Sequence, residues 1–204
     1  MIALIDYRAG NLTSVKKALS YLNAEITVPT SPTALSGCSG IIVPGVGNFE
    51  ATSSLGNGWT SAVVDHVRQG VPLLGICLGL QWLFAGSEEA PNISGLGEIA
   101  GTCALLPGDD GAERLKVPHV GWNSLNLKRS SWLLEGVADG SQVYFTHSFA
   151  APLTDECAAS TTYGVEFASV VERDQVAGVQ FHPEKSGDVG LTILKNYLKR
   201  AGSI

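Results

Sequence analysis

The sequence is poor in charged residues, which occupy 16% of its 204 positions and sum to a formal charge of −6 at neutral pH. A negative protein is repelled by phosphates and by anionic lipids, so we expect neither nucleic acid nor a membrane as a partner. Hydrophobic residues make up 45% of the chain, and glycine is frequent. This composition favours a compact, enzyme-like fold over a disordered or coiled-coil chain. The length suits one domain spanning residues 1–204.

Cysteine is also scarce, and its positions, Cys38, Cys77, Cys103 and Cys157, lie far apart. They form no CxxC pair and have no histidine at ligand spacing, so the sequence predicts neither a metal site nor a disulfide framework. We expect no cofactor. Reduced thiols are typical of cytoplasmic proteins. The first residues, "MIALIDYRAGN", have no basic start and no small-residue cleavage site, so we expect no signal peptide.

Long hydrophobic runs are missing too. The most apolar passage, "GVPLLGICLGLQWLFAG", contains Pro72, Gln81 and several glycines, and it falls short of the roughly 20 apolar residues that a membrane span needs. The chain likewise has no complete GxGxxG motif and no P-loop lysine, so its glycine-rich turns are weak candidates for a phosphate site.

The first half of the chain alternates short apolar runs with helical patterns, which is typical of a parallel sheet covered by helices. The second half has several short β runs separated by polar turns, which indicates some antiparallel pairing. We therefore predict an α/β fold with a mostly parallel central sheet flanked by helices, of the flavodoxin-like kind. The expected strands lie within 2–6, 25–29, 39–45, 71–77, 98–106, 142–150, 166–172 and 176–182; the expected helices begin near Leu12 and Trp59 and cover 188–200.

Cys77 lies in "GICLGLQ", where the last apolar strand of the first half meets a helical pattern. A nucleophile on a sharp strand-to-helix turn needs small residues two positions before and after it, and Gly75 and Gly79 stand there. The following helix would favour the thiolate, and the backbone N–H of Leu78 could stabilise an oxyanion. A buried structural cysteine explains the same residue, because unpaired cysteine is among the most buried residue types.

A base and its orienting carboxylate are offered by "VQFHPE" at the end of a strand. Pro183 keeps the chain extended, so the side chains of His182 and Glu184 project toward the same side. Without the elbow, His182 could simply end a strand and Glu184 could be a solvated surface residue. His147, in "YFTHSFA", is a rival base without such a carboxylate; we expect it beside the substrate, at an interface, or as a structural hydrogen-bonding residue.

The turn "PGVG" follows the strand "GIIV" and contains Gly45 and Gly47. Glycines leave the backbone bare, so N–H groups near Val46 and Gly47 could approach a developing negative charge, as an oxyanion hole requires. An ordinary turn accounts for the same residues.

Taken in order, "PGVG", "GICLGLQ" and "FHPE" resemble the motifs of class I, triad-type glutamine amidotransferases, over nearly the whole chain. "PHVGWN" at 118–123, "YFTHSFA" and "HPEKSG" narrow the resemblance to the glutaminase subunits of imidazole glycerol phosphate synthases, in histidine biosynthesis. Related synthases more often have "PGPG", and the family often has Tyr in place of Phe149 and Arg in place of Lys17.

The resemblance implies that L-glutamine is the substrate, that Cys77 attacks its side-chain amide, that His182 transfers protons and that Glu184 orients His182. It further implies that Gln81 and Glu89 hold the glutamine head group, with help from the backbone around Gly47 and Ser148. His147 is expected among the substrate-binding residues as well. The implied partner is a (β/α)₈ cyclase subunit that receives ammonia through a channel. Four residues match family positions at or near that interface: Asn11, Trp122, Tyr144 and Lys185.

Two other functions share parts of this pattern. A cysteine peptidase or γ-glutamyl hydrolase on a similar fold would have the same elbow and base, and peptide cleavage rather than ammonia release from glutamine would identify it. A binding subunit with an inert buried thiol would keep the fold without the chemistry, and alkylation of Cys77 by a glutamine-like electrophile would count against it.

Overall fold

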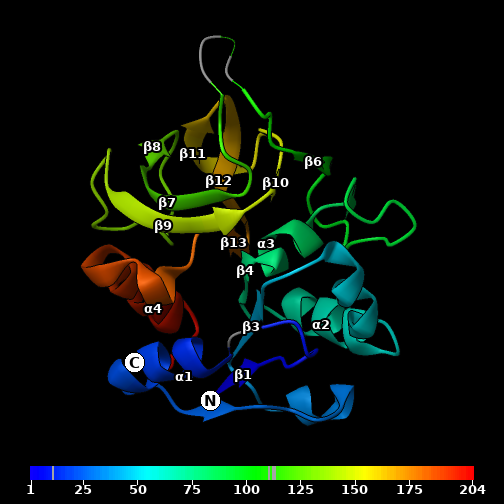
Figure 1. The fold of residues 1–204 in the computed structure, drawn as a ribbon. Coiled ribbons are helices and arrows are strands. Elements are labelled where there is room, and N and C mark those ends of the chain that lie inside the picture. Colours follow the sequence, from blue (N-terminus) through cyan, green and yellow to red (C-terminus); the bar gives the residue numbers. More distant parts are fainter. Residues whose placement is uncertain (11, 110, 112–113) are drawn as a thin grey trace.

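A computed structural model describes the protein at residues 1–10, 12–109, 111 and 114–204 (Figure 1). Within these residues the central element is an eight-stranded sheet with the order β2-β1-β3-β4-β13-β12-β11-β8. The pairings from β2 to β13 are parallel and the remaining ones are antiparallel. The strands are β2 (Ile26–Thr27), β1 (Ile2–Leu4), β3 (Gly40–Gly45), β4 (Leu73–Cys77), β13 (Val176–Val179), β12 (Val165–Arg173), β11 (Cys157–Tyr163) and β8 (Asn126–Leu127).

The parallel part of the sheet has the strand order of flavodoxin-like folds, in which ligands bind beyond the carboxyl ends of the strands. The predicted fold class is therefore confirmed, including the antiparallel strands of the second half. The "PGVG" turn begins in the last two residues of β3, Cys77 is the last residue of β4, and the "FHPE" segment comes shortly after β13. Because the carboxyl ends of these neighbouring parallel strands lie together, the three sequence motifs meet at one edge of the sheet.

Helices cover both faces of this sheet, so its central strands are buried on both sides. The helices α1 (Leu12–Tyr21) and α4 (Gly187–Arg200) pack on one face, where they share a core with alternate strand residues such as Ile42 and Leu74. The helices α2 (Trp59–Arg68) and α3 (Leu78–Leu83) pack on the other face, against neighbours such as Ile41 and Val43. Figure 1 shows α1 and α4 together on one side and α2 on the opposite side.

Smaller sheets stand at one end of the fold, across the top of the view in Figure 1. The strands β7 (His119–Ser124) and β9 (Gln142–His147) form an antiparallel pair that places His119 opposite His147 and Trp122 opposite Tyr144. The strands β10 (Phe149–Ala150), β6 (Thr102–Leu105) and β5 (Gly86–Ser87) form a second small sheet. Short 3₁₀ helices are η1 (Pro32–Leu35), η2 (Phe49–Leu55) and η3 (Pro183–Lys185).

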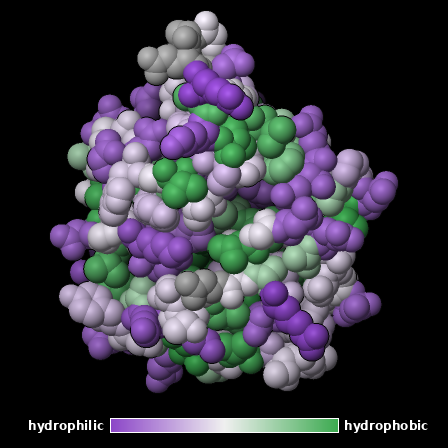
Figure 2. All heavy atoms as spheres, viewed as in Figure 1, coloured by the Kyte–Doolittle hydropathy of each residue, from purple (hydrophilic) through white to green (hydrophobic). Residues whose placement is uncertain are grey.

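Two long strands, β7 and β11, were not among the expected ones. In β11 the first five residues are all buried and most are small, so the chain shows neither an alternating pattern nor a run of large aliphatic side chains. Among the described residues, no helix has the length and apolar character needed to cross a bilayer. On the face drawn in Figure 2, hydrophobic residues lie among hydrophilic ones rather than in one continuous patch.

Candidate active site

Cys77 occupies a strained backbone conformation between β4 and α3. Its φ of 54° and ψ of −104° are rarely adopted by a residue with a side chain, and such strain persists at functional turns where surrounding structure enforces it. Both flanking glycines are required by close contacts. A Cβ on Gly75 would lie 2.4 Å from the carbonyl oxygen of Gly79, and one on Gly79 would lie 1.8 Å from that of Val43. The predicted strand–cysteine–helix elbow is therefore present.

His182 and Glu184 form a buried pair beside this elbow. Nδ1 of His182 lies 2.9 Å from Oε1 of Glu184, and the two side chains are 3% and 1% exposed. Because a carboxylate only accepts, Nδ1 carries the proton, which leaves Nε2 for another task. Among the described residues Nε2 has no hydrogen-bond partner in this structure. The pair thus has the orientation that a base and its orienting carboxylate need.

The electrostatic environment favours the charged form of His182. Burial lowers the pKa of this imidazole, but the nearby sulfur of Cys77 and the carboxylate of Glu184 outweigh burial and raise the pKa to about 9. The ring is also fixed through its backbone. The N–H of His182 donates to the carbonyl of Tyr144 at 2.9 Å, and the hydroxyl of Ser186 donates to the carbonyl of His182 at 2.6 Å.

The "PGVG" turn lies next to Cys77, since Gly45 pairs with Cys77 in the register of β3 and β4. The backbone N–H of Val46 donates to the carbonyl of Ala9 at 2.6 Å, so this predicted oxyanion donor is engaged elsewhere in the observed conformation. Gly47 has a φ of 101°, which a residue with a side chain rarely adopts. The hydroxyl of Tyr7 packs against Gly45, where an added Cβ would lie 1.9 Å from it.

A cavity of about 280 Å³ opens in front of Cys77. This is a suitable size for a small polar metabolite. Predicted site residues from four separate segments meet in it. Its lining residues are Gly47, Cys77, Gln81, Glu89, Pro118, Thr146, His147, Ser148 and Phe149.

Gln81 is 4% exposed and its amide is oriented by the protein. Its Nε2 donates to the carbonyl of Phe149 at 2.9 Å and to Oε1 of Gln180 at 3.3 Å, so both amide protons have partners. The amide oxygen of Gln81 is the group that a ligand's N–H could use. Glu89 accepts the backbone N–H of Phe49 at 2.7 Å, which ties this carboxylate to the segment directly after the "PGVG" turn.

The predicted interface residues that the structure describes form a cluster separate from the cavity. The rings of Trp122 and Tyr144 are 6.1 Å apart, and Nζ of Lys185 lies 5.7 Å from the centre of the Tyr144 ring. Trp122 is 56% exposed, which is unusual for so large an apolar side chain. The fourth predicted residue, Asn11, lies outside the described residues.

Two residues of the site were missed in the sequence. Gln180 is fully buried and donates from Nε2 to the sulfur of Cys77 at 3.7 Å. A signal existed, because strand alternation places Gln180 on the side of His182 and a polar residue there interrupts an apolar run. His119 contacts His147, and it had no signal beyond its place in "PHVGWN".

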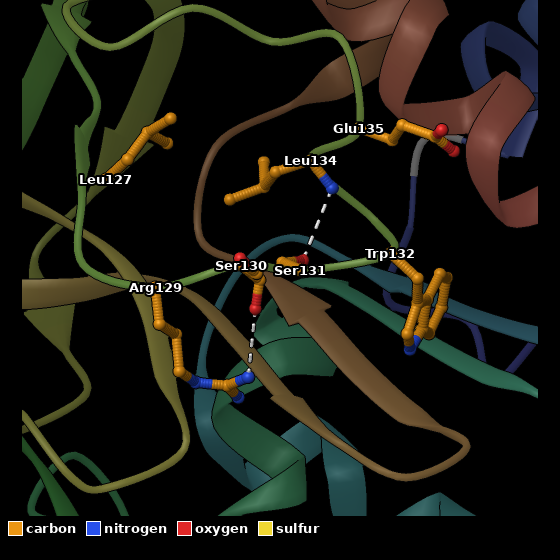
Figure 3. A pocket seen from close by; sticks show the side chains of 7 residues that line it. All are labelled: Leu127, Arg129, Ser130, Ser131, Trp132, Leu134 and Glu135. Atoms are coloured by element: carbon orange, nitrogen blue, oxygen red, sulfur yellow. Dashed lines mark hydrogen bonds between the residues drawn. The ribbon is translucent and has the colours of Figure 1, made fainter.

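A larger cavity, of about 420 Å³, lies away from these residues along the loop from Leu127 to Glu135. Figure 3 shows the side chains that line it, among them Arg129 and Ser131. Arg129 pairs with Glu172 and donates to the carbonyl of Ser130, and the Ser131 hydroxyl donates to Glu172. The polar groups of this loop thus brace the buried Glu172, and the cavity contains none of the predicted site residues.

The chain matches known proteins over almost its full length. Residues 3–201 match the family described as "Glutamine amidotransferase class-I". A protein of Geobacillus thermodenitrificans named "Imidazole glycerol phosphate synthase subunit HisH" is 47% identical over 204 residues, 97% of this chain and 95% of that protein. Proteins with the same name from Chlorobium luteolum and Archaeoglobus fulgidus are each 43% identical and cover 97% of this chain and 98% of their own length.

Solved structures agree on the fold. One titled "Crystal structure of glutamine amidotransferase" superposes with a TM-score of 0.75 at 21% identity, covering 99% of this chain and 100% of that chain. Another, titled "Structure of PurLQS from Thermotoga maritima", gives 0.69 at 17% identity with 97% coverage of each chain. The chain therefore belongs to the class I glutamine amidotransferases, and within them to the HisH subunits of imidazole glycerol phosphate synthase.

Proposed function

We propose that this chain hydrolyses L-glutamine to L-glutamate and ammonia through a thioester on Cys77, and passes the ammonia to a cyclase subunit. The observation that carries the proposal is the strained Cys77 elbow together with the buried His182–Glu184 pair, whose imidazole interacts with the sulfur of Cys77. Among the described residues with side chains, positive φ also occurs at Arg8, Asn23, Asn57 and Asp174, which are all exposed. At Cys77 it falls instead on a buried thiol at the strand-to-helix junction, and strain held at such a site supports a functional role over an inert one.

In the first half of the reaction, Cys77 gives its thiol proton to Nε2 of His182, whose charged form the site favours, and the resulting thiolate attacks the side-chain amide carbon of glutamine. The tetrahedral intermediate collapses as His182 returns that proton to the departing nitrogen, which leaves as ammonia. In the second half, His182 takes a proton from water, which attacks the thioester carbon and releases glutamate with the restored thiol. Glu184 keeps Nδ1 protonated throughout, and its charge stabilises the imidazolium.

The cavity supports glutamine over a peptide as substrate. Its volume of about 280 Å³ suits one amino acid, and the carboxylate of Glu89 on its wall can pair with an α-ammonium group. The amide oxygen of Gln81 can accept from the same substrate. A peptidase requires an open groove for residues on both sides of the cleaved bond, so a peptide substrate is the weaker alternative.

The isolated chain is proposed to be a latent glutaminase. The N–H of Val46 points to Ala9 rather than to the cavity, and removing one oxyanion donor typically costs about 10²–10³ in rate. Rotation of the peptide before Val46 would break the bond to Ala9 and supply the donor, together with the N–H groups of Gly47 and Leu78. A partner that stabilises the rotated state would activate the enzyme, which prevents wasteful hydrolysis of glutamine.

The partner is proposed to be a (β/α)₈ cyclase that docks over Trp122, Tyr144 and Lys185. Tyr144 joins this surface to the site, because its carbonyl holds the N–H of His182 and its own N–H donates to Ser186 at 3.0 Å. Lys185→Ala should reduce the stimulation of glutaminase by the cyclase more than it reduces the basal rate. Full activity in the isolated wild-type chain, unchanged by the liganded partner, would refute both latency and docking.

The test of the proposed function compares two nitrogen sources in the complex with the cyclase. Cys77→Ala should abolish synthesis from glutamine and leave synthesis from added ammonia intact. Cys103→Ala, which removes another buried thiol outside the cavity, should leave both intact. Glutamine-dependent synthesis that survives in Cys77→Ala would refute the role of the nucleophile.

A further inference from the structure

His119 and His147 are joined in a buried chain of hydrogen bonds that runs to the wall of the cavity. Nδ1 of His119 lies 3.1 Å from Nε2 of His147, and Nδ1 of His147 lies 2.9 Å from the carbonyl oxygen of Phe149. At the other end, Nδ2 of Asn123 lies 3.4 Å from Nε2 of His119 and donates to the carbonyl of Thr162 at 3.0 Å. The two rings are only 3% and 6% exposed.

Backbone groups at the two ends fix the direction of every bond. At one end, the N–H of Ser124 donates to Oδ1 of Asn123 at 2.8 Å, so Nδ2 must be the atom that faces His119. Nε2 of His119 is therefore the acceptor, and its Nδ1 carries the proton. At the other end, the carbonyl of Phe149 can only accept, so Nδ1 of His147 is protonated and its Nε2 accepts from His119. Both ends require the same tautomers, and both rings are neutral.

The surroundings hold this arrangement in place. His119 is stacked between Phe145 and Tyr163, with ring centres 4.9 and 4.1 Å away. His147 meets the edge of Phe167 at 5.1 Å. Burial lowers the pKa of each histidine to about 4, which agrees with two uncharged rings at neutral pH. A charged ring would lose an acceptor that a neighbour needs.

The chain of hydrogen bonds ends at the carbonyl of Phe149, a residue that also lines the cavity. The carbonyl of Phe149 accepts from both His147 and Gln81, and His147 bonds across Ser148 to the residue two positions later. The ring thereby fixes the turn at Ser148, which lines the cavity. Since both nitrogens of His147 are used within the protein, His147 has no ring nitrogen left to bind substrate.

We propose that His119 is a positioning residue for glutamine binding, acting through His147 to fix the Ser148–Phe149 wall and the amide of Gln81. The proposal rests on the glutaminase function proposed above. His119 does not line the cavity itself. Its Nδ1–H nevertheless occupies Nε2 of His147, so the proton of His147 stays on Nδ1 and is donated to the carbonyl of Phe149. Loss of its Nδ1 donor leaves an acceptor of His147 unpaired and the wall free to shift, which weakens binding of glutamine more than it slows the chemistry.

The first test reads the tautomers directly and does not depend on activity. The chain has four histidines, so nitrogen NMR of the full chain labelled in histidine can be assigned with one variant for each. Neutral imidazole in water favours a proton on Nε2, whereas His119 and His147 should both carry it on Nδ1 at neutral pH. An Nε2–H tautomer or a charged ring at either position would overturn the proposal.

The second test measures glutamine hydrolysis in the complex with the cyclase. His119→Phe keeps the stacked ring and removes both nitrogens, so KM for glutamine should rise roughly tenfold while kcat changes less than about threefold. His119→Asn places an amide N–H where Nδ1 stood and should restore KM, whereas His119→Gln reaches only the Nε2 position and should not. His66→Asn, outside the chain of bonds, is the control.

A KM unchanged in His119→Phe, or equal KM values for His119→Asn and His119→Gln, would overturn the positioning role. A wild-type complex that hydrolyses no glutamine would instead refute the proposed function, and the tautomers would still decide whether the hydrogen-bond chain exists.

Discussion

Acidification should destabilise the protein through the buried pair of His119 and His147. In the unfolded chain a histidine has a pKa of about 6.5, whereas burial lowers both pKa values to about 4 in the fold. Between these pH values the unfolded state binds more protons than the folded state. The contribution of this pair to the free energy of unfolding is therefore fully present above about pH 6.5 and falls as the pH drops toward 4.

The size of the loss follows from the two pKa values. Between pH 7 and pH 5 each ring should lower the free energy of unfolding by about 2 kcal/mol. His182 acts in the opposite direction, because its pKa is raised to about 9 and its contribution, which is lost as the pH rises through 9, is fullest below pH 6.5. That gain is only about 1 kcal/mol over the same interval, so a net loss of about 3 kcal/mol is expected.

Urea unfolding followed by tryptophan fluorescence at pH 7 and pH 5 measures this difference. The double variant His119→Phe/His147→Phe should lose most of the pH dependence, whatever its absolute stability, while His66→Phe should keep it. The same carboxylates titrate in all three proteins, so the pH dependence that the double variant loses relative to the wild type comes from His119 and His147. Equal unfolding free energies of the wild type at both pH values, or the same pH dependence in the double variant, would refute the reasoning.

Two further predictions concern the elbow and the base. Gly79→Ala places a Cβ against the carbonyl of Val43 and should lower the free energy of unfolding, measured by thermal unfolding, by at least about 2 kcal/mol. Gly108→Ala, in open space, should be close to neutral. Similar losses in the two variants would contradict the packing argument. His182→Ala should lower kcat by about 10²–10⁴, whereas His147→Ala should chiefly raise KM for glutamine, and steady-state kinetics with the opposite ranking would reverse the assignment of the base.

The sequence predicted the parts of the molecule in which local pattern and tertiary structure agree. The elbow is an example, because Gly75 lies against the carbonyl of Gly79 within the turn and Gly79 lies against the carbonyl of Val43 on the adjacent strand β3, so both positions leave no room for a side chain. The pairing of His182 with Glu184 followed from strand geometry in the same way. The parallel strands were recognisable because strands buried on both faces consist of aliphatic runs.

The parts that were missed depend on contacts between distant segments. The strand β11 is built of small residues whose burial only the neighbouring strands reveal. His119 joins the site solely because the pairing of β7 with β9 places it opposite His147. The engagement of Val46 with Ala9 is a choice between two peptide orientations, which no residue pattern encodes.

The central claim is that glutamine is hydrolysed through a covalent bond to Cys77, and trapping that bond tests it most directly. The complex with the cyclase should be mixed with labelled glutamine, quenched in acid within the first turnover and digested for mass spectrometry. A γ-glutamyl thioester should appear on the peptide that contains Cys77 and should be absent from Cys77→Ala. Glutamine turnover with no adduct on that peptide, or with the adduct on Cys38, Cys103 or Cys157, would contradict the account.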